Sequence, residues 1–298
     1  MNSLQDYKYL ISVAETLHFG KAAELCHISQ PTLSGQIKKM ESLIGFKIFE
    51  RSNRKVTITR KGLPMISEAR KVVEAQKSFK QKSKELLSPY SGELHFGLIP
   101  TLAPYLLPHI MPQLNMKLPK MNFYLYEQET EVLLSQLNKG KLDALILPYL
   151  PEMQTFTKIK LFDEPLVLAL PSKHPLAKKQ SLLLSDLKGQ QVLTLKDGHC
   201  LREQTLGYCF IAGAKEDASF SATSLETLRH MISAGAGITL MPELATFNRE
   251  DKGMLYRKFS SEIPSREIVL LTRSTYSNTV SVTQVSEIIT HIIADKLL

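Results

Sequence analysis

The sequence has little of what secreted, metal-binding or membrane-spanning proteins require. Only three of its 298 residues are cysteine, and none is tryptophan. Three cysteines are too few for a disulfide framework or a zinc ribbon, and no HExxH pattern is present. The longest apolar run, at 142–150, is interrupted by Asp143 and Pro148 and falls short of the ~18 residues that span a bilayer. The first residues have no basic start followed by an apolar stretch. We therefore expect a cytoplasmic protein with no membrane contact, metal or cofactor.

The positive charge is confined to one part of the chain. A length of 298 residues is enough for about two domains. Residues 1–90 contain sixteen Lys or Arg against eight Asp or Glu, whereas the remainder holds twenty-one of each. The whole net charge of +8 therefore lies in the first third. Such a local excess favours a surface that binds phosphates, although a solvated basic face or a membrane-surface patch has the same composition.

The first third has the pattern of a helix-turn-helix. Apolar residues recur every three or four positions over 4–17 and 30–44, which predicts two helices. Between them, a short helix at 20–27 is expected to turn Ala22, Ala23 and Leu25 inward, with Cys26 in the core. Ser29 can cap the third helix, and Pro31 fits its first turn. Two short helices, a tight turn and a third helix make the motif.

Several polar side chains of this region are candidates for DNA contact. In a helix-turn-helix the second helix of the motif lies in the major groove and presents its first residues to the bases. Residues 46–59 alternate apolar and polar residues, which predicts a two-stranded wing with a basic tip. The alternative is a plain three-helix bundle with a hairpin. The candidate residues are Gln30, Pro31, Thr32, Ser34, Gln36, Lys38, Arg51 and Arg54.

A long helix and a break separate this region from the rest of the chain. Residues 63–87 contain no Gly or Pro after Pro64, and a heptad seam runs along them. A lone helix of this length needs a partner, and a second copy of the chain is the simplest one, although it could pack only against its own chain. The seam consists of Met65, Ala69, Val72, Gln76, Phe79, Ser83 and Leu86. The segment 88–92 (SPYSG) then marks a domain boundary.

After this boundary the pattern changes to strands that alternate with helices. This alternation predicts an α/β domain with a parallel sheet in two lobes, crossed near 163 and again near 267. The cleft between such lobes is a common ligand site. The predicted strands are 94–99, 121–126, 142–147, 166–170, 192–195, 238–241 and 268–271, and the predicted helices are 105–114, 130–138, 224–234 and 280–297.

A set of residues in the first 62 positions forms a recognisable family pattern: Phe19, Ala22, Ala23, the segment SQPTLS at 29–34, Ile37, Glu41, Gly45, FER at 49–51 and TRKG at 59–62. With these residues the sequence resembles LysR-type transcriptional regulators. The resemblance implies a multidomain protein, in which an all-α winged helix-turn-helix DNA-binding domain (1–62) precedes a linker dimerisation helix and hinge (63–90). An α/β, periplasmic-binding-protein-like, two-lobed regulatory domain follows (91–298), with lobe I at 91–163 and 268–298 and lobe II at 164–267.

The second domain resembles those members of the family that sense hydrogen peroxide through two cysteines. The matching segments are LIPT at 98–101, PYLLP at 104–108, LFDEP at 161–165, DGHCLR at 197–202 and ATSLETLR at 222–229. The resemblance implies that Cys200 is the peroxidatic cysteine and Cys209 the resolving one. It places Thr101, Thr130, His199 and Arg266 around the peroxide. It further implies a non-enzymatic regulator of antioxidant genes that binds double-stranded DNA and RNA polymerase as a dimer of dimers, with a thiol reductant such as glutaredoxin.

The implied chemistry makes two physical demands. A thiolate is the attacking species, so we expect Cys200 to have a lowered pKa, at a helix start and near donors such as His199, Arg202 and Arg266. If 200–209 is helical, the two Cα atoms lie ~13–14 Å apart. A disulfide needs ~4.4–6.8 Å. We therefore expect that joining Cys200 to Cys209 forces this segment to change its structure.

Other interpretations of the same residues remain open. The cysteines could be buried and inert, in a regulator that binds a small metabolite between its lobes. A metal could bind His199, Cys200 and Cys209, although no fourth ligand is evident. His199 could be only a loop residue, and Thr101 could only cap a helix. A thiol peroxidase is a third possibility, and the DNA-binding pattern argues against it.

Overall fold

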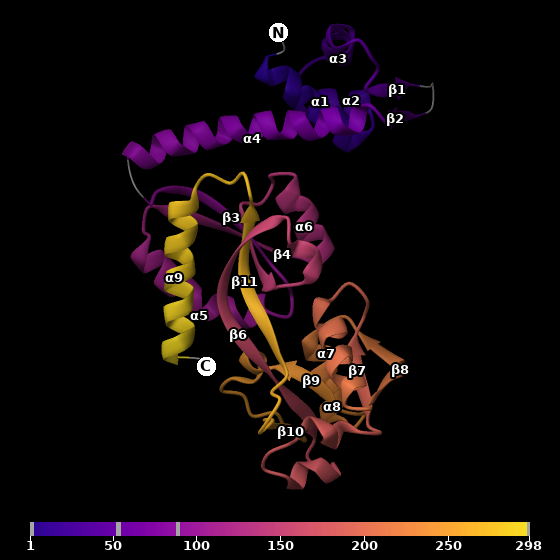
Figure 1. Ribbon diagram of the computed structural model, residues 1–298, viewed down its shortest axis with the longest axis vertical. Helices are drawn as coiled ribbons and strands as arrows, with labels where there is room; N and C mark the ends of the chain where they lie inside the picture. Colours follow the sequence, from indigo (N-terminus) through magenta and orange to yellow (C-terminus); the bar gives the residue numbers. More distant parts are fainter. Residues whose placement is uncertain (1–2, 52–54, 88–89, 297–298) are drawn as a thin grey trace. The chain divides into compact units, whose positions relative to one another are not determined.

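The computed structural model describes residues 3–51, 55–87 and 90–296. It divides into two compact units, each with its own hydrophobic core. Unit 1 comprises Met1–Pro89 with Thr275–Asn278, and unit 2 comprises Tyr90–Ser274 with Thr279–Leu298. Figure 1 shows the elements of both. A search of the described helices finds none that is both long and apolar enough to cross a membrane.

Unit 1 consists of three helices, a β-hairpin and a long helix. The hydroxyl of Ser29 accepts a hydrogen bond from the N–H of Thr32 at 3.3 Å and caps α3, and Pro31 occupies the first turn. Gly45 ends α3 with a φ of 81°, which glycine adopts without steric cost. The predicted helix-turn-helix is confirmed. The elements are α1 (Leu4–Thr16), α2 (Phe19–Leu25), α3 (Gln30–Ile44), β1 (Phe49–Arg51), β2 (Val56–Ile58) and α4 (Gly62–Leu87).

A buried carboxylate joins α3 to the hairpin. Glu41 is only 3% exposed, and its Oε1 accepts hydrogen bonds from the N–H groups of Ile48 and Phe49 at 2.8 and 3.0 Å. Lys47 Nζ lies 3.4 Å from the other carboxylate oxygen. A buried carboxylate is costly unless it is hydrogen-bonded. These contacts therefore fix the place where the hairpin begins relative to α3.

Leu25 and Cys26, at the end of α2, are less buried than predicted. Leu25 is 67% exposed instead of facing inward, and Cys26 is only partly buried, at the C-cap of α2. The helix ends at Leu25, and His27 then takes a left-handed φ of 53°. Because α2 is only seven residues long, its buried face has room for Ala22 and Ala23 but not for the residues at its end.

Part of the α4 seam packs against other residues of unit 1. Ala69 is buried in the core of unit 1, where α4 packs against α1. Further along the helix, Val72 is 41% exposed and Phe79 is 78% exposed. The seam residue Leu86 lies in the part of α4 whose side chains are outside the described set. At these two positions the seam thus presents apolar side chains to solvent.

The described part of unit 2 contains a curled mixed sheet of seven strands, a separate two-stranded sheet formed by residues 191–195 and 215–222, and helices around them. Its strands are β3 (Gly92–Leu98), β4 (Met121–Glu127), β5 (Ala144–Pro148), β6 (Phe156–Pro171), β7 (Gln191–Leu195), β8 (Lys215–Ala222), β9 (Thr239–Pro242), β10 (Met254–Arg257) and β11 (Ser265–Arg273). Its α-helices are α5 (Ala103–Lys117), α6 (Thr130–Asn138), α7 (Cys200–Ile211), α8 (Leu225–Ser233) and α9 (Thr279–Lys296).

The sheet is parallel over only part of its width. Strand β3 pairs in parallel with β4 and with β5. By contrast, β11 is antiparallel to β5 and β6, and β6 is antiparallel to β9 and β10. The prediction of a parallel sheet is therefore wrong for these strands. The reason is that β6 and β11 are long strands of opposite direction, and neither belongs to a strand–helix–strand unit with its neighbour.

Three strands or parts of strands were not predicted. Residues 156–165 form the first part of β6. The charged residues Lys158, Lys160 and Asp163 interrupt the apolar pattern that would predict a strand there. Strand β8 is mostly exposed and polar, and β10 has only four residues. These strands form because they pair with strands far along the chain. A local sequence pattern holds no information about such partners.

Strands β6 and β11 connect the two lobes of unit 2. They lie side by side along most of their length (Figure 1), with Asp163 opposite Glu267 and Glu164 opposite Arg266. These are the positions at which we expected the chain to cross between lobes. On the far side of the crossing, Leu201 and Cys209 of α7 pack into the core of the second lobe.

The role of Glu41 can be tested by the substitution Glu41→Gln. An amide oxygen accepts the two backbone N–H bonds more weakly than a carboxylate oxygen, and the amide NH₂ would replace the oxygen that lies near Lys47. We expect the free energy of unfolding of unit 1 to fall by about 1–3 kcal/mol, measured by urea denaturation of the full chain. The matched control is Glu68→Gln, since Glu68 is an exposed partner of Lys71. Equal effects of the two substitutions would contradict this account.

Candidate functional site

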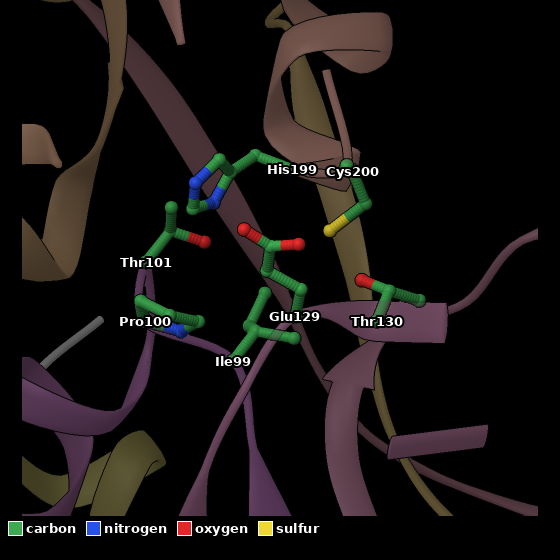
Figure 2. A pocket seen from close by; sticks show the side chains of 8 residues that line it. Ile99, Pro100, Thr101, Glu129, Thr130, His199 and Cys200 are labelled. Carbon is green, nitrogen blue, oxygen red and sulfur yellow. The ribbon is translucent and has the colours of Figure 1, made fainter. Parts of the chain in front are cut away.

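A small pocket lies where three segments of unit 2 meet. The segments are the loop after β3, the start of α6 and the start of α7 (Figure 2). The empty volume is about 150 Å³. The lining side chains nearly fill this space, so it suits only a very small molecule. It is lined by Ile99, Pro100, Thr101, Glu129, Thr130, Gly198, His199 and Cys200.

Cys200 is the first residue of α7 and is 6% exposed. Burial raises the pKa of its thiol above the ordinary value of 9.0. The charge of Arg266, the hydroxyl of Thr130 and the backbone N–H groups of Cys200 and Leu201 favour the thiolate but do not outweigh burial. The sequence correctly predicted the helix start and the cation, but the expected net fall of the pKa is wrong for this resting structure.

Arg266 is held by a fully buried ion pair. Its Nε donates to Glu164 Oε2 at 2.7 Å, and both side chains have no exposed area. Its other two nitrogens donate to the hydroxyl and the carbonyl of Thr101, at 3.1 and 3.0 Å. Burial raises the pKa of Glu164, an effect that the charge of Arg266 opposes. Arg266 is thus absent from the pocket wall, but it fixes Thr101 there and brings a positive charge near Cys200.

Two buried polar atoms at the pocket have no hydrogen-bond partner of ordinary length among the described residues. They are Thr130 Oγ1 and His199 Nε2. Figure 2 shows the Thr130 hydroxyl on the same side of the pocket as the Cys200 sulfur. Burial lowers the pKa of His199, an effect that the charge of Glu129 opposes and that the charge of Lys196 reinforces. His199 is therefore neutral at pH 7, with a ring nitrogen available to a bound molecule. Unpartnered buried groups of this kind indicate a site for a small polar ligand.

An ion pair lies at the pocket between the two lobes. Glu129, before α6, accepts a hydrogen bond from Lys196, after β7, at 2.7 Å. This bond holds the pKa of the Glu129 carboxyl below its ordinary value. A Glu129 oxygen also lies 3.1 Å from the position that a Cβ on Gly198 would take. The pair therefore links the loop before Cys200 to the loop before Thr130, and because both side chains are more than a third exposed the contact is weak.

Cys209 is distant from the pocket but lies on the same helix as Cys200. Both cysteines are free thiols, and Cys209 has no exposed area. Burial raises the pKa of Cys209 to about 12. Nine helical steps of ~1.5 Å separate the two Cα atoms by ~13–14 Å, whereas a disulfide allows ~4.4–6.8 Å. Within this fold the two sulfurs cannot bond.

The structure thus brings together most of the predicted site residues. Thr101, Thr130 and His199 line the pocket with Cys200, and Arg266 contacts Thr101. Their roles toward peroxide stay predictions. Among the described residues no group of three or more His, Cys, Asp or Glu side chains could hold a metal. The alternative metal site at His199, Cys200 and Cys209 therefore has no support.

Glu164, Glu129 and Lys196 were not predicted as site residues. Glu164 could have been noticed, because a carboxylate directly before the apolar run at 166–170 needs a buried partner. Its partner, Arg266, lies 102 residues later, and nothing local identifies it. In the sequence, nothing distinguishes Glu129 and Lys196 from other charged residues. Only the approach of the two lobes places them together.

The candidate DNA-contacting residues lie on α3 and the hairpin of unit 1. Gln30, Pro31, Thr32 and Lys38 are exposed, and Ser34 and Gln36 are partly buried. The Arg51 guanidinium donates to Ser34 Oγ at 2.6 Å and lies 3.9 Å from the centre of the Phe19 ring. Arg54 lies outside the described residues. All these positions stay predictions for DNA contact.

The helix-turn-helix unit, together with the two-lobed unit and its pocket, defines a class of bacterial regulator. Residues 4–63 match the bacterial regulatory helix-turn-helix protein, lysR family, and residues 88–291 match the LysR substrate binding domain. The second match alone covers more than half of the chain, so the chain belongs to the LysR family of transcriptional regulators.

Within this family the chain is similar to OxyR proteins. It is 47% identical over 272 residues to the DNA-binding transcriptional dual regulator OxyR of Escherichia coli strain K12, which covers 91% of this chain and 89% of the relative. A full-length Pseudomonas aeruginosa OxyR with a cysteine-to-aspartate substitution has 32% identity and a TM-score of 0.77, over 97% and 95% of the two chains. A Corynebacterium glutamicum OxyR cysteine-to-serine mutant with hydrogen peroxide bound has 31% identity and a TM-score of 0.68, over 99% and 94%. The predicted fold class is confirmed.

The raised pKa of Cys200 predicts how its oxidation depends on pH. Below the pKa the thiolate fraction grows about tenfold per pH unit. Because burial raises this pKa above 9.0, we expect the rate of Cys200 oxidation by peroxide to rise continuously from pH 6 to pH 9. The measurement is thiol loss by alkylation and mass spectrometry, in a Cys26→Ser, Cys209→Ala background. A rate that is constant above pH 7 would mean that Arg266 and the helix start outweigh burial.

Proposed function

We propose that this LysR-family protein is a DNA-binding transcriptional regulator that hydrogen peroxide switches through Cys200 and Cys209. The observation that carries the proposal is the pocket with two unpartnered buried polar atoms, Thr130 Oγ1 and His199 Nε2, next to a buried thiol. Hydrogen peroxide has two oxygens, and each can donate and accept. The similarity to OxyR supports the same function.

The size of the pocket favours peroxide over a metabolite. The lining side chains nearly fill the pocket. A metabolite could enter only if the walls moved widely apart, whereas a molecule of a few atoms needs only a small displacement. The polar lining also suits an oxidant that needs donors on both of its oxygens.

The first chemical step is the oxidation of Cys200. The Cys200 thiolate attacks one peroxide oxygen, an S–O bond forms and the O–O bond breaks. The products are a sulfenic acid and hydroxide, which takes up the proton that the thiol released and becomes water. Thr101, Thr130 and His199 would orient the peroxide and donate to the departing oxygen, which lowers the barrier by positioning. Arg266 would stabilise the thiolate.

The second step converts the chemical signal into a structural one. The Cys209 sulfur displaces water from the sulfenic acid and forms a disulfide with Cys200. Because α7 holds the two Cα atoms ~13–14 Å apart, the bond requires this helix to bend or unfold. The Glu129–Lys196 pair and the packing of Cys209 in the core oppose this change. The remodelled second lobe would alter how copies of the chain are arranged on DNA.

The exposed apolar side chains of α4, Val72 and Phe79, support pairing of two copies through this helix. Two copies supply two α3 helices for two half-sites of an operator.

The proposal further includes pairing of dimers into tetramers, contact with RNA polymerase, reduction of the disulfide by a cellular thiol reductant such as glutaredoxin, and a cytoplasmic location. It includes no catalytic turnover, since each molecule consumes one peroxide for each oxidation.

The central test is the disulfide itself. After one equivalent of peroxide, peptide mapping by mass spectrometry should find Cys200 joined to Cys209, with Cys26 still alkylatable. The pattern of DNase protection on a bound operator should change at the same time. In the variant Cys200→Ser both effects should be absent.

Two other outcomes would favour the alternatives. An operator footprint that ignores peroxide but responds to a metabolite would favour the metabolite regulator. Repeated peroxide consumption with thioredoxin, many equivalents for each molecule of protein, would favour a thiol peroxidase.

The DNA-contacting residues can be tested through salt dependence. Each phosphate contact that is lost should reduce the slope of log affinity against log salt by ~0.9. We expect Arg51→Ala to flatten this slope, and Gln36→Ala to change base preference with the slope unchanged. The measurement is fluorescence anisotropy with operator DNA from 50 to 200 mM salt. An unchanged slope for Arg51→Ala would assign Arg51 to the packing with Ser34 and Phe19 alone.

A further inference from the structure

A tyrosine beside the resolving cysteine connects α7 to strand β11. Tyr208 precedes Cys209, and its hydroxyl donates to the carbonyl oxygen of Ser265 at 2.9 Å. The same hydroxyl accepts a hydrogen bond from the N–H of Ser265 at 3.2 Å. Ser265 is the first residue of β11 and directly precedes Arg266. One side chain thus satisfies both backbone groups of a strand residue.

The pairing of β11 explains why these backbone groups are available. The N–H of Leu166 donates to the carbonyl of Pro264, so Pro264 bonds to β6. In an antiparallel ladder the backbone groups of successive residues point to opposite sides, and those of Ser265 therefore point away from β6. On that side β5 pairs with β11 only from Ile268 onward. The Tyr208 hydroxyl takes the place that a neighbouring strand would occupy.

The rest of the last turn of α7 is weakly held. Phe210 and Ile211 are 62% and 80% exposed, so they contribute little packing. The Cys209 side chain is fully buried and has only apolar packing, while its carbonyl accepts a hydrogen bond from the N–H of Ala214. The Tyr208–Ser265 contact is therefore a directional tether on the turn that carries the resolving sulfur.

We propose that the Tyr208 hydroxyl is a positioning group that sets the rate of disulfide closure. It holds the Cys209 turn in its reduced place, and this hold must be released before Cys209 can reach the Cys200 sulfenic acid. The first step, oxidation of Cys200, does not involve the tether. Because Ser265 adjoins Arg266, the tether also anchors the turn to the strand that supports Thr101. This inference rests on the proposed function.

The test is the variant Tyr208→Phe, which removes the hydroxyl and keeps the ring. Sulfenic acid and disulfide are followed separately by quenching with an alkylating reagent and mass spectrometry, after mixing the full chain with peroxide. We expect closure to be about three- to tenfold faster, since a net hydrogen bond contributes about a factor of this size. The disulfide-to-dithiol ratio in a thiol redox buffer should rise by a similar factor, and the rate of Cys200 oxidation should not change.

The matched control is Tyr105→Phe. Tyr105 also lies in unit 2 and donates its hydroxyl to Glu226 at 3.1 Å, but it lies outside α7. A general loss of stability would change both variants alike, whereas a tether on Cys209 changes only Tyr208→Phe. Equal closure rates for Tyr208→Phe and the unmodified chain would overturn the inference. If the unmodified chain forms no Cys200–Cys209 disulfide at all, the proposed function fails instead.

Discussion

The buried pair of Glu164 and Arg266 is the interaction on which unit 2 depends. The two residues face each other across β6 and β11, at the point where both strands pass from one lobe to the other. Removing one partner of such a pair leaves a buried charge and typically costs about 3–5 kcal/mol. The pair also sets the site, because Arg266 binds Thr101 on one side and places its charge near Cys200 on the other. Arg266 therefore serves both the packing of unit 2 and the site around Cys200.

Helix α7 adds a second constraint, which is geometric. It starts at Cys200, so the sulfur has the backbone donors of a first helical turn, and the same helix carries Cys209 too far away to bond. The feature that assists the first chemical step thus prevents the second one within the resting fold. If Cys200 and Cys209 form a disulfide, α7 must change its structure, because both cysteines lie on this helix.

The sequence predicted local features well and long-range ones poorly. Helix α3 begins and ends where predicted, because Ser29 and Gly45 are caps that act within one turn. The start of α7 at Cys200 was also predicted. Strand direction was wrong for β6, β9 and β11, and β10 was not predicted, since partners such as Glu164 and Arg266 are 102 residues apart. For the same reason Glu129 and Lys196 were not recognised: two exposed charges become a pocket feature only after the lobes meet.

The raised pKa of Cys200 bears on selectivity for the oxidant. A thiol with a low pKa at the surface reacts with many electrophiles, whereas a buried neutral thiol is slow toward all of them. Thr130 Oγ1 and His199 Nε2 lie at a nearly closed pocket beside Cys200. Under the proposed function, both groups would donate only to a molecule small enough to enter this pocket, where charge develops on its departing oxygen. The proposal thus assigns the choice of oxidant to the fit in the pocket more than to the intrinsic reactivity of the sulfur.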